Sequence, residues 1–213
     1  MERFICIVIG YLFGLIQTSY IIGRTQGIDI RSRGSGNAGT TNALRTLGAK
    51  WGAITLLGDV GKCILAVLLT WLIFHKGYPD TVQLLKIWTA AGVILGHDFP
   101  FYMGFKGGKG FASMVGMAIA FCDWYVLLVC AIVFFCLFFT LHYVSLSSLS
   151  TSVTFLIGVI ISGQMGKYLM PQAALIEMYL VIGALVLLTF IKHRSNIARL
   201  LKGEERKTFL KKH

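Results

Sequence analysis

Residues 124–141 read WYVLLVCAIVFFCLFFTL, a stretch without a single charged side chain. A helix of about 20 apolar residues crosses the hydrocarbon core of a bilayer, so this stretch predicts a membrane span. The whole chain has the same character: of its 213 residues, 56% are hydrophobic and 14% are charged, against about 25% charged in a typical soluble domain. This composition excludes an intrinsically disordered chain and argues against a soluble globular domain.

Further apolar segments lie on both sides of this stretch. Together they predict an all-α polytopic membrane bundle of about seven transmembrane helices, which forms a single domain over residues 1–213. The third and fourth segments are short and can be two crossings or one re-entrant pair. Two crossings are favoured because Asp123 and Trp124, which follow the fourth segment, suit a tight external turn. The expected spans lie near 4–23, 51–74, 84–96, 111–122, 124–141, 146–162 and 172–191.

The basic residues orient this bundle. With seven crossings, fifteen of the 20 Lys and Arg residues fall on one face, in segments 24–50, 97–110 and 192–213, and four fall on the other. Cytoplasmic loops carry the excess of Lys and Arg, so the C-terminus is expected in the cytoplasm and the N-terminus outside. The same distribution accounts for most of the net charge of +11 without a nucleic-acid partner.

Several residues inside the spans bear on packing. GxxxG spacings at 10–14 and 48–52 permit close contact between helices. Asp59 and Lys62 lie three residues apart in the second span, and ionisable groups in a membrane are costly unless they are paired. We therefore expect an ion pair between them that faces the bundle. The five cysteines lie in apolar stretches without a C-x-x-C pair, which favours neither zinc ligation nor disulfides.

Segment 33–45, RGSGNAGTTNALR, is the first of three polar segments on the face predicted to be cytoplasmic. Its glycines match G-x-G-x-x-G, but that dinucleotide fingerprint requires a preceding strand, and here membrane spans flank it. Glycines still let backbone N–H groups converge on an anion, and a helix N-terminus adds a positive dipole. Arg45 can reach back from the next helix to a bound phosphate. We favour a phosphate-binding loop over a flexible linker with a helix cap.

Segment 96–110, GHDFPFYMGFKGGKG, places Lys106 and Lys109 in a glycine run. It is not a Walker P-loop, because Gly110 follows Lys109 where Ser or Thr would be needed. We expect a second phosphate cradle before the fourth span. His97 can belong to this site or pack in the core, and Asp98 beside it can orient it.

Segment 192–207, KHRSNIARLLKGEERK, begins where the last span meets water. Its apolar face can lie on the membrane as a juxtamembrane helix bound to anionic headgroups. Alternatively, His193, Arg194 and Asn196 can close over a site. The residues alone leave both interpretations open.

Together the three segments resemble the acyl-phosphate:glycerol-3-phosphate acyltransferases, a bacterial family of integral membrane enzymes at the start of phospholipid synthesis. The matching stretches are GSGNAGTTN at 34–42 with Arg45, GHDFPFYMGFKGGKG at 96–110 and KHRSNIARLLKGEE at 192–205, in the same order and spacing. One departure is Cys63, where familiar members show the glycine of D-x-x-K-G.

This resemblance implies transfer of an acyl chain from acyl phosphate to the 1-hydroxyl of sn-glycerol 3-phosphate, giving lysophosphatidate and phosphate. It implies a multi-pass protein of the bacterial inner or plasma membrane, in contact with membrane lipids, with its active site on the cytoplasmic face. No metal or organic cofactor is implied. The oligomeric state is left open, and a monomer is compatible with the sequence.

The expected site residues follow from their chemistry and from this resemblance. Substrate-binding roles are expected for Gly34, Gly36, Asn37, Gly39, Thr41, Asn42, Arg45, Gly107 and Gly108. Catalytic roles are expected for Ser35, His97, Lys106, Lys109, His193 and Asn196. Positive groups would stabilise the phosphate leaving group and the developing oxyanion. Direct attack by the glycerol hydroxyl is expected, because Ser35 lacks an evident Ser–His–Asp set. The proton acceptor is left open between a histidine and a substrate phosphate.

The sequence also carries features typical of two other classes of protein. Residues 75–80, HKGYPD, give the H-x-x-x-x-D pattern used by some glycerolipid acyltransferases, but the predicted topology puts His75 and Asp80 on the outer face. A transporter of organic phosphates also surrounds anions with broken helices and glycines, and it is expected to show internal repeats and a midplane site. This chain shows no internal repeat, and its polar groups gather on one face.

Overall fold

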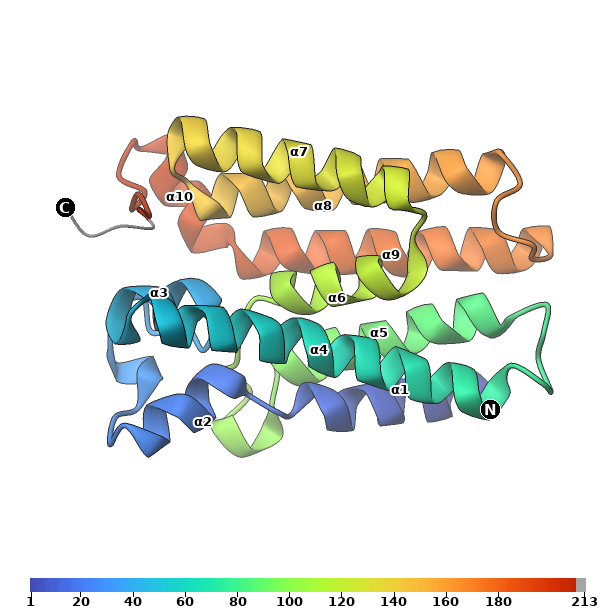
Figure 1. Cartoon of the computed structure of the whole chain (residues 1–213), viewed down its shortest axis with the longest axis horizontal. Coiled ribbons are helices and arrows are strands. Elements are labelled where there is room, and N and C mark those ends of the chain that lie inside the picture. Colours follow the sequence, from blue (N-terminus) through green and yellow to red (C-terminus); the bar gives the residue numbers. More distant parts are fainter. Residues whose placement is uncertain (210–213) are drawn as a thin grey trace.

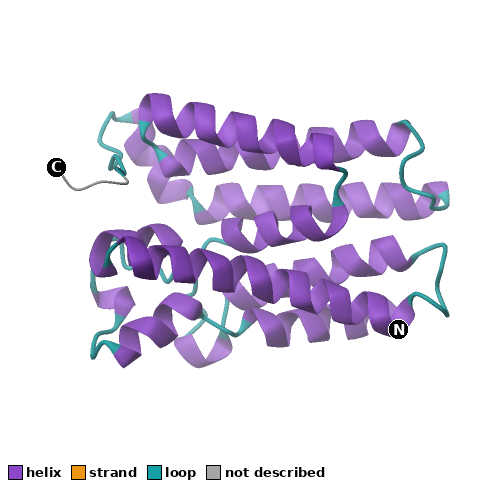
Figure 2. Cartoon of the chain, in the orientation of Figure 1, coloured by secondary structure: helices purple, strands orange, loops and turns teal. Residues whose placement is uncertain are grey.

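The computed structural model describes residues 1–209, which form helices and no strand (Figures 1 and 2). The all-α prediction is confirmed. The elements are α1 Glu2–Gly14, α2 Thr18–Thr25, η1 Ile30–Ser32, α3 Thr40–Leu47, α4 Ala49–Phe74, α5 Val82–Asp98, η2 Phe101–Met103, α6 Phe111–Phe121, α7 Trp124–Leu141, α8 Val144–Gln164, α9 Gln172–Lys192 and α10 Arg194–Leu201.

Five helical segments of the described chain are long and apolar enough to cross a membrane. The other two predicted spans correspond to α5, with 17 residues, and α6, with 11. At about 1.5 Å of rise per residue, α6 alone is too short for a hydrocarbon core of about 30 Å. The predicted count of seven is therefore not confirmed by helix length. The five segments are Glu2–Thr25, Ala49–Phe74, Trp124–Leu141, Val144–Gln164 and Gln172–Lys192.

The long helices run back and forth along one axis, and α1 begins at the end of the molecule opposite to α10 (Figure 1). One half holds α1 to α5 and the other holds α7 to α10, with the short α6 between them. Helix α6 packs on α4 and α5 and touches α8, while α5 also packs on α9. Helices α3 and α10 lie at the same end of the bundle, so the polar segments far apart in sequence meet there.

Helices α1 and α5 approach closely because glycines line their contact. A Cβ atom on Gly10 would overlap the carbonyl oxygen of Thr89, and one on Gly96 would overlap that of Tyr11. Without side chains at these positions, the two backbones can touch. The close packing predicted from the GxxxG spacing at 10–14 is confirmed.

The second GxxxG spacing, at 48–52, acts differently. Gly48 has a positive φ of 93° and forms the turn between α3 and α4, with open space where a Cβ would be. Gly52 lies against α3, since its Cβ would come 2.8 Å from the Cβ of Leu44. Only the second glycine of this pair serves helix packing, and it joins two consecutive helices at a sharp turn.

The surface of the bundle is apolar and part of its interior is polar, as expected for a protein in a bilayer. Leu57 and Leu180 are 71% and 70% exposed on α4 and α9. In contrast, Ser147 and Ser152 of α8 are fully buried, and their hydroxyls donate to backbone carbonyls one turn earlier. Lipid can cover the outer face, while small hydroxyl side chains let helices pack inside.

Candidate active site

A half-buried lysine lies at the centre of the candidate site. Lys109 immediately precedes the cap of α6, and its ammonium donates a hydrogen bond to Asn196 Oδ1 on α10. Burial lowers the pKa of Lys109 to about 8; Glu205 opposes this shift, and three basic side chains reinforce it. These basic neighbours are Arg199, Arg45 and Lys192. Positive charge is thus concentrated where the two halves of the bundle meet.

Arg45 reaches the same region from α3. Its guanidinium donates to the carbonyl oxygen of Arg206 at 2.9 Å and to Thr208 Oγ1 at 2.5 Å. Burial lowers the pKa of Arg45, but a guanidinium stays charged at neutral pH. The arginine predicted to reach a phosphate is therefore held by the C-terminal segment in this structure.

Glu205 is the acidic centre of this cationic region, and the sequence did not single it out. Its carboxylate accepts hydrogen bonds from Asn196 Nδ2 at 2.6 Å, Ser145 Oγ at 2.9 Å and Arg199 Nε at 2.8 Å. Burial acts to raise the pKa of Glu205, but these hydrogen bonds outweigh it, and the pKa lies below its ordinary value. The only hint in the sequence is that Glu204 and Glu205 are the acidic residues of an otherwise basic C-terminal segment, which suggests an internal ion pair.

His193 lies between α9 and α10, next to Lys109 in space. Its Nδ1 is 2.8 Å from the carbonyl oxygen of Thr189, which can only accept, so Nδ1 carries the proton and Nε2 a lone pair. Burial lowers the pKa of His193 to about 4, and the charge of Lys109 adds to this effect. The side chain is therefore neutral at physiological pH.

The first glycine loop is held by Asn42 of α3. The Asn42 amide accepts from Ser35 N at 2.8 Å and donates to the carbonyl oxygens of Ile30 and Arg33. Gly34 has φ of 59°, and a Cβ there would overlap Asn42 Oδ1, so the turn needs glycine. All three side-chain contacts of Asn42 go to backbone atoms of η1 and the glycine loop. Its predicted contact with substrate stays a prediction.

The structure brings part of the first loop to the C-terminal segment. Gly34 O accepts from the Arg206 guanidinium at 3.5 Å, while Ser35 and Gly36 are exposed beside it. Three other residues predicted to bind substrate lie between this turn and the first helical turn of α3, and they are partly buried. They are Asn37, Gly39 and Thr41.

The second glycine loop folds back onto the end of α5. Gly107 N donates to Asp98 O at 3.2 Å and Gly108 N to His97 O at 2.9 Å, so both N–H groups are engaged by protein carbonyls. A Cβ on Gly108 would overlap His97 Nε2. Gly108 allows close approach to the His97 ring and Gly107 to the His97 carbonyl oxygen, and their contact with phosphate stays a prediction. Lys106 is exposed, unlike Lys109.

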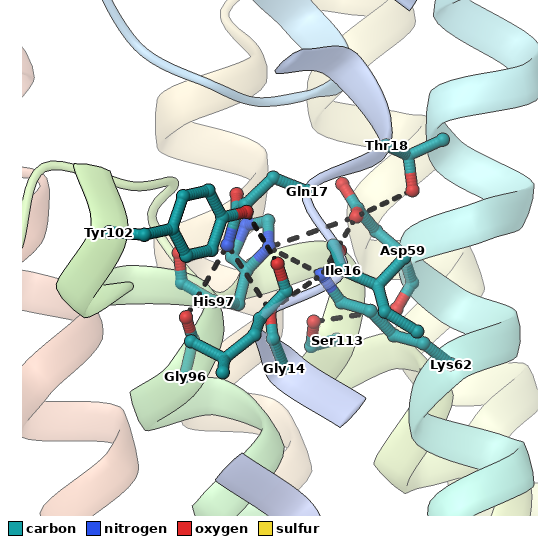
Figure 3. A network of polar contacts seen from close by, with 11 residues as sticks. Gly14, Ile16, Gln17, Thr18, Asp59, Lys62, Gly96, His97, Tyr102 and Ser113 are labelled. Carbon is teal, nitrogen blue, oxygen red and sulfur yellow. Dashed lines mark hydrogen bonds and ion pairs between the residues drawn. The ribbon is translucent and has the colours of Figure 1, made fainter. Parts of the chain in front are cut away.

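His97 is buried in a network with the two ionisable residues of the second span (Figure 3). Lys62 Nζ lies 3.0 Å from Asp59 Oδ1 and 2.8 Å from His97 Nδ1. The predicted Asp59–Lys62 ion pair is confirmed. Asp98 does not orient His97 as expected, since neither of its carboxylate oxygens has a hydrogen-bond partner in the part of the chain that the structure describes. Lys62 takes that role.

Comparison with known proteins decides the family. Residues 4–203 match the family described as glycerol-3-phosphate acyltransferase. The chain belongs to the glycerol-3-phosphate acyltransferase family. The glycerol-3-phosphate acyltransferase of Clostridioides difficile is 39% identical over 206 residues, covering 96% of this chain and 95% of that protein. The one from Thermosipho melanesiensis is 37% identical over 210 residues, covering 98% and 94%.

Two solved structures share the fold. Crystal structures of PlsY (YgiH), an integral membrane glycerol 3-phosphate acyltransferase, are known in a glycerol 3-phosphate form and a lysophosphatidic acid form. The first has a TM-score of 0.81 at 32% identity and covers 98% of this chain and 96% of that one. The second has a TM-score of 0.79 at 31% identity, covering 99% and 97%. This acyltransferase is therefore an integral membrane protein of the same fold.

The H-x-x-x-x-D pattern of some other acyltransferases plays no part in this site. His75 caps the end of α4, where its Nδ1 contacts Trp71 O at 2.9 Å, and Asp80 is exposed in the loop to α5. That loop lies at the end of the bundle opposite α3 and α10 (Figure 1). The interpretation of HKGYPD as a chance match agrees with this placement.

Proposed function

We propose that the protein transfers an acyl chain from acyl phosphate to the 1-hydroxyl of sn-glycerol 3-phosphate, giving lysophosphatidate and phosphate. The observation that carries the proposal is the gathering of Lys109, Arg45 and Arg199 with neutral His193 and Asn196 at one end of the bundle. Both substrates carry a phosphate, and cations in a half-buried site bind phosphate more strongly than they would in water. The solved relatives in glycerol 3-phosphate and lysophosphatidic acid forms support the acceptor and the product.

The proposed reaction is one displacement at the acyl carbon. The 1-hydroxyl oxygen attacks this carbon and forms the new ester C–O bond, while the bond between the acyl carbon and the phosphate oxygen breaks. Phosphate leaves with the bonding electron pair. The positive charge of Lys109 and Arg45 stabilises both the oxyanion at the acyl carbon and the departing phosphate.

The hydroxyl proton goes to a phosphate oxygen. His193 is a weak base at neutral pH because its pKa is about 4. A phosphate monoester accepts a proton with a pKa of about 6, so it is the stronger acceptor. His97 accepts from Lys62 through Nδ1, and its ring is buried against Gly108 of the second glycine loop. We therefore favour a substrate phosphate over His97 as the acceptor of the hydroxyl proton.

We also propose seven crossings, with α5 and α6 as the third and fourth, a cytoplasmic C-terminus and a site on the cytoplasmic face of the plasma membrane. Two observations support this arrangement. Helix α1 begins at the end of the bundle opposite to α10, as an odd number of crossings requires (Figure 1). Most Lys and Arg residues flank the end that carries α3 and α10, which the positive-inside rule assigns to the cytoplasm. The segments 24–50, 97–110 and 192–213 then belong to one domain.

The donor is tested with detergent-purified protein and radiolabelled glycerol 3-phosphate. The same acyl chain is offered as acyl phosphate, as acyl-CoA and as acyl carrier protein thioester, without a vesicle or gradient. We expect label in lysophosphatidate with acyl phosphate alone. Label with the thioesters instead would refute the proposed donor. A trapped acyl adduct on Ser35 during turnover would replace direct attack with a covalent route.

A further inference from the structure

The first membrane helix is interrupted, and its free backbone groups are bound by side chains. Helix α1 ends at Gly14 and α2 starts at Thr18. The carbonyl oxygens of the intervening turn have lost their helical partners, and each such group left unpaired in a bilayer is costly. Here Gly14 O accepts from Gln17 Nε2 at 3.2 Å, Leu15 O from Tyr102 OH at 2.6 Å and Ile16 O from Lys62 Nζ at 2.7 Å.

The Lys62 ammonium is fully used by protein acceptors. An ammonium has three N–H donors, and Nζ has four acceptors: Ile16 O at 2.7 Å, His97 Nδ1 at 2.8 Å, Asp59 Oδ1 at 3.0 Å and, more distant, Gly14 O at 3.4 Å. The side chain is 3% exposed. Lys62 thus has no free donor for a substrate, and its contacts lie on three different elements.

Each of these contacts leads to a segment that carries site residues. Asp59 Oδ1 also accepts from Thr18 Oγ1 at 3.2 Å, at the start of α2, and α2 leads into the first glycine loop. On the other side, Lys62 can only donate, so His97 Nδ1 is the acceptor and the proton of the neutral ring lies on Nε2. Nε2 faces Gly108, next to Lys109 (Figure 3 shows the Lys62 side of this contact).

The geometry points to Lys62 as a positioning residue: its ammonium locks the break in the first membrane helix to the His97 ring and thereby fixes the loop from which Lys109 enters the site. A simple ion pair with Asp59 would need neither the helix break nor the histidine. The network instead connects α1 (through Gly14 O), α2, α4 and α5 through one buried charge. This inference rests on the proposed function only in naming what Lys109 binds.

The test measures the position of Lys109 without turnover. Competitive acetylation with trace acetic anhydride over a pH series, followed by peptide mass spectrometry, gives the pKa of Lys109. In the wild type this value is held at about 8 by burial near a set of charged groups. Those groups are Glu205, Arg199, Arg45 and Lys192, with the Asn196 amide in contact.

The principal variant is Asp59→Asn/Lys62→Met, which removes both charges and leaves no unpaired ion in the bundle. If Lys62 fixes the loop, Lys109 becomes more solvated, and its pKa rises by about one to two units toward the ordinary value of about 10.4. Lys86→Met is the matched control, since Lys86 is another half-buried lysine, on α5, whose ammonium contacts Gln83. The control should leave Lys109 unchanged.

A monodisperse double variant with the wild-type pKa at Lys109 overturns the inference. If the double variant does not fold, the inference is tested with His97→Ala instead. This variant keeps the Asp59–Lys62 ion pair and removes the ring that lies between Lys62 and Gly108. The same upward shift is expected, and an unchanged pKa again overturns the inference. Absence of acyl transfer by the wild type would refute the proposed function, but it would leave the labelling result intact.

Discussion

The titration of Lys109 gives the sharpest prediction for activity. Its pKa is held at about 8 by burial, so the ammonium is lost as the pH rises through that value. About nine-tenths of the lysine is charged at pH 7 and about one-tenth at pH 9. If the charge stabilises the transition state, kcat/KM should fall about tenfold between these two values. The phosphate of glycerol 3-phosphate changes little over this range, since with a second pKa of about 6 it is already about nine-tenths dianionic at pH 7.

The assay is the initial rate of lysophosphatidate formation over a pH series, with the spontaneous hydrolysis of acyl phosphate subtracted at each pH. Lys109→Arg is the control variant, because a guanidinium keeps its charge over this range. The arginine changes the geometry and lowers the rate, so the shape of the profile decides. We expect a profile without the alkaline decline. The same decline in wild type and Lys109→Arg would refute the assignment to Lys109.

Three further substitutions test other parts of the account. Arg45→Ala should lower kcat/KM by raising the activation free energy by about 2–4 kcal/mol, with little change in thermal stability. Wild-type kinetics would remove Arg45 from the site. Glu205→Ala should lower the free energy of unfolding by about 2–3 kcal/mol, because it leaves buried donors unpaired, whereas exposed Glu204→Ala should not; equal melting temperatures would contradict the anchoring role. Gly108→Ala should lower activity, because the added Cβ overlaps the His97 ring; normal activity would show that this contact is not needed.

Much of the fold follows from local sequence signals. Long apolar runs such as 124–141 predict helices directly, and glycine spacing at 10–14 predicts the close contact of α1 and α5. The break at residues 15–17 was not predicted, although Gln17 lies there. The sequence stays mostly apolar on both sides of the break, so hydropathy does not reveal it. The side chains that bind the free carbonyl oxygens, Lys62 of α4 and Tyr102 of the loop after α5, lie far along the chain.

The site was predicted in part for a similar reason. Basic and glycine-rich motifs predict Lys109 and Arg45, and the family resemblance predicts Asn196; the structure brings these three residues to one end of the bundle. The sequence missed Glu205, because its role depends on contacts with α8 and α10 that no local pattern encodes. It also placed His97 among the reacting groups, whereas the structure buries the ring against Lys62.

Acyl transfer from acyl phosphate is tested most directly by phosphate release from palmitoyl phosphate, measured on purified protein with and without sn-glycerol 3-phosphate. We expect release only when the glycerol phosphate is present, with one lysophosphatidate formed for each phosphate released. Release without the acceptor, or acceptor-dependent release without lysophosphatidate, would contradict acyl transfer as the function of this site.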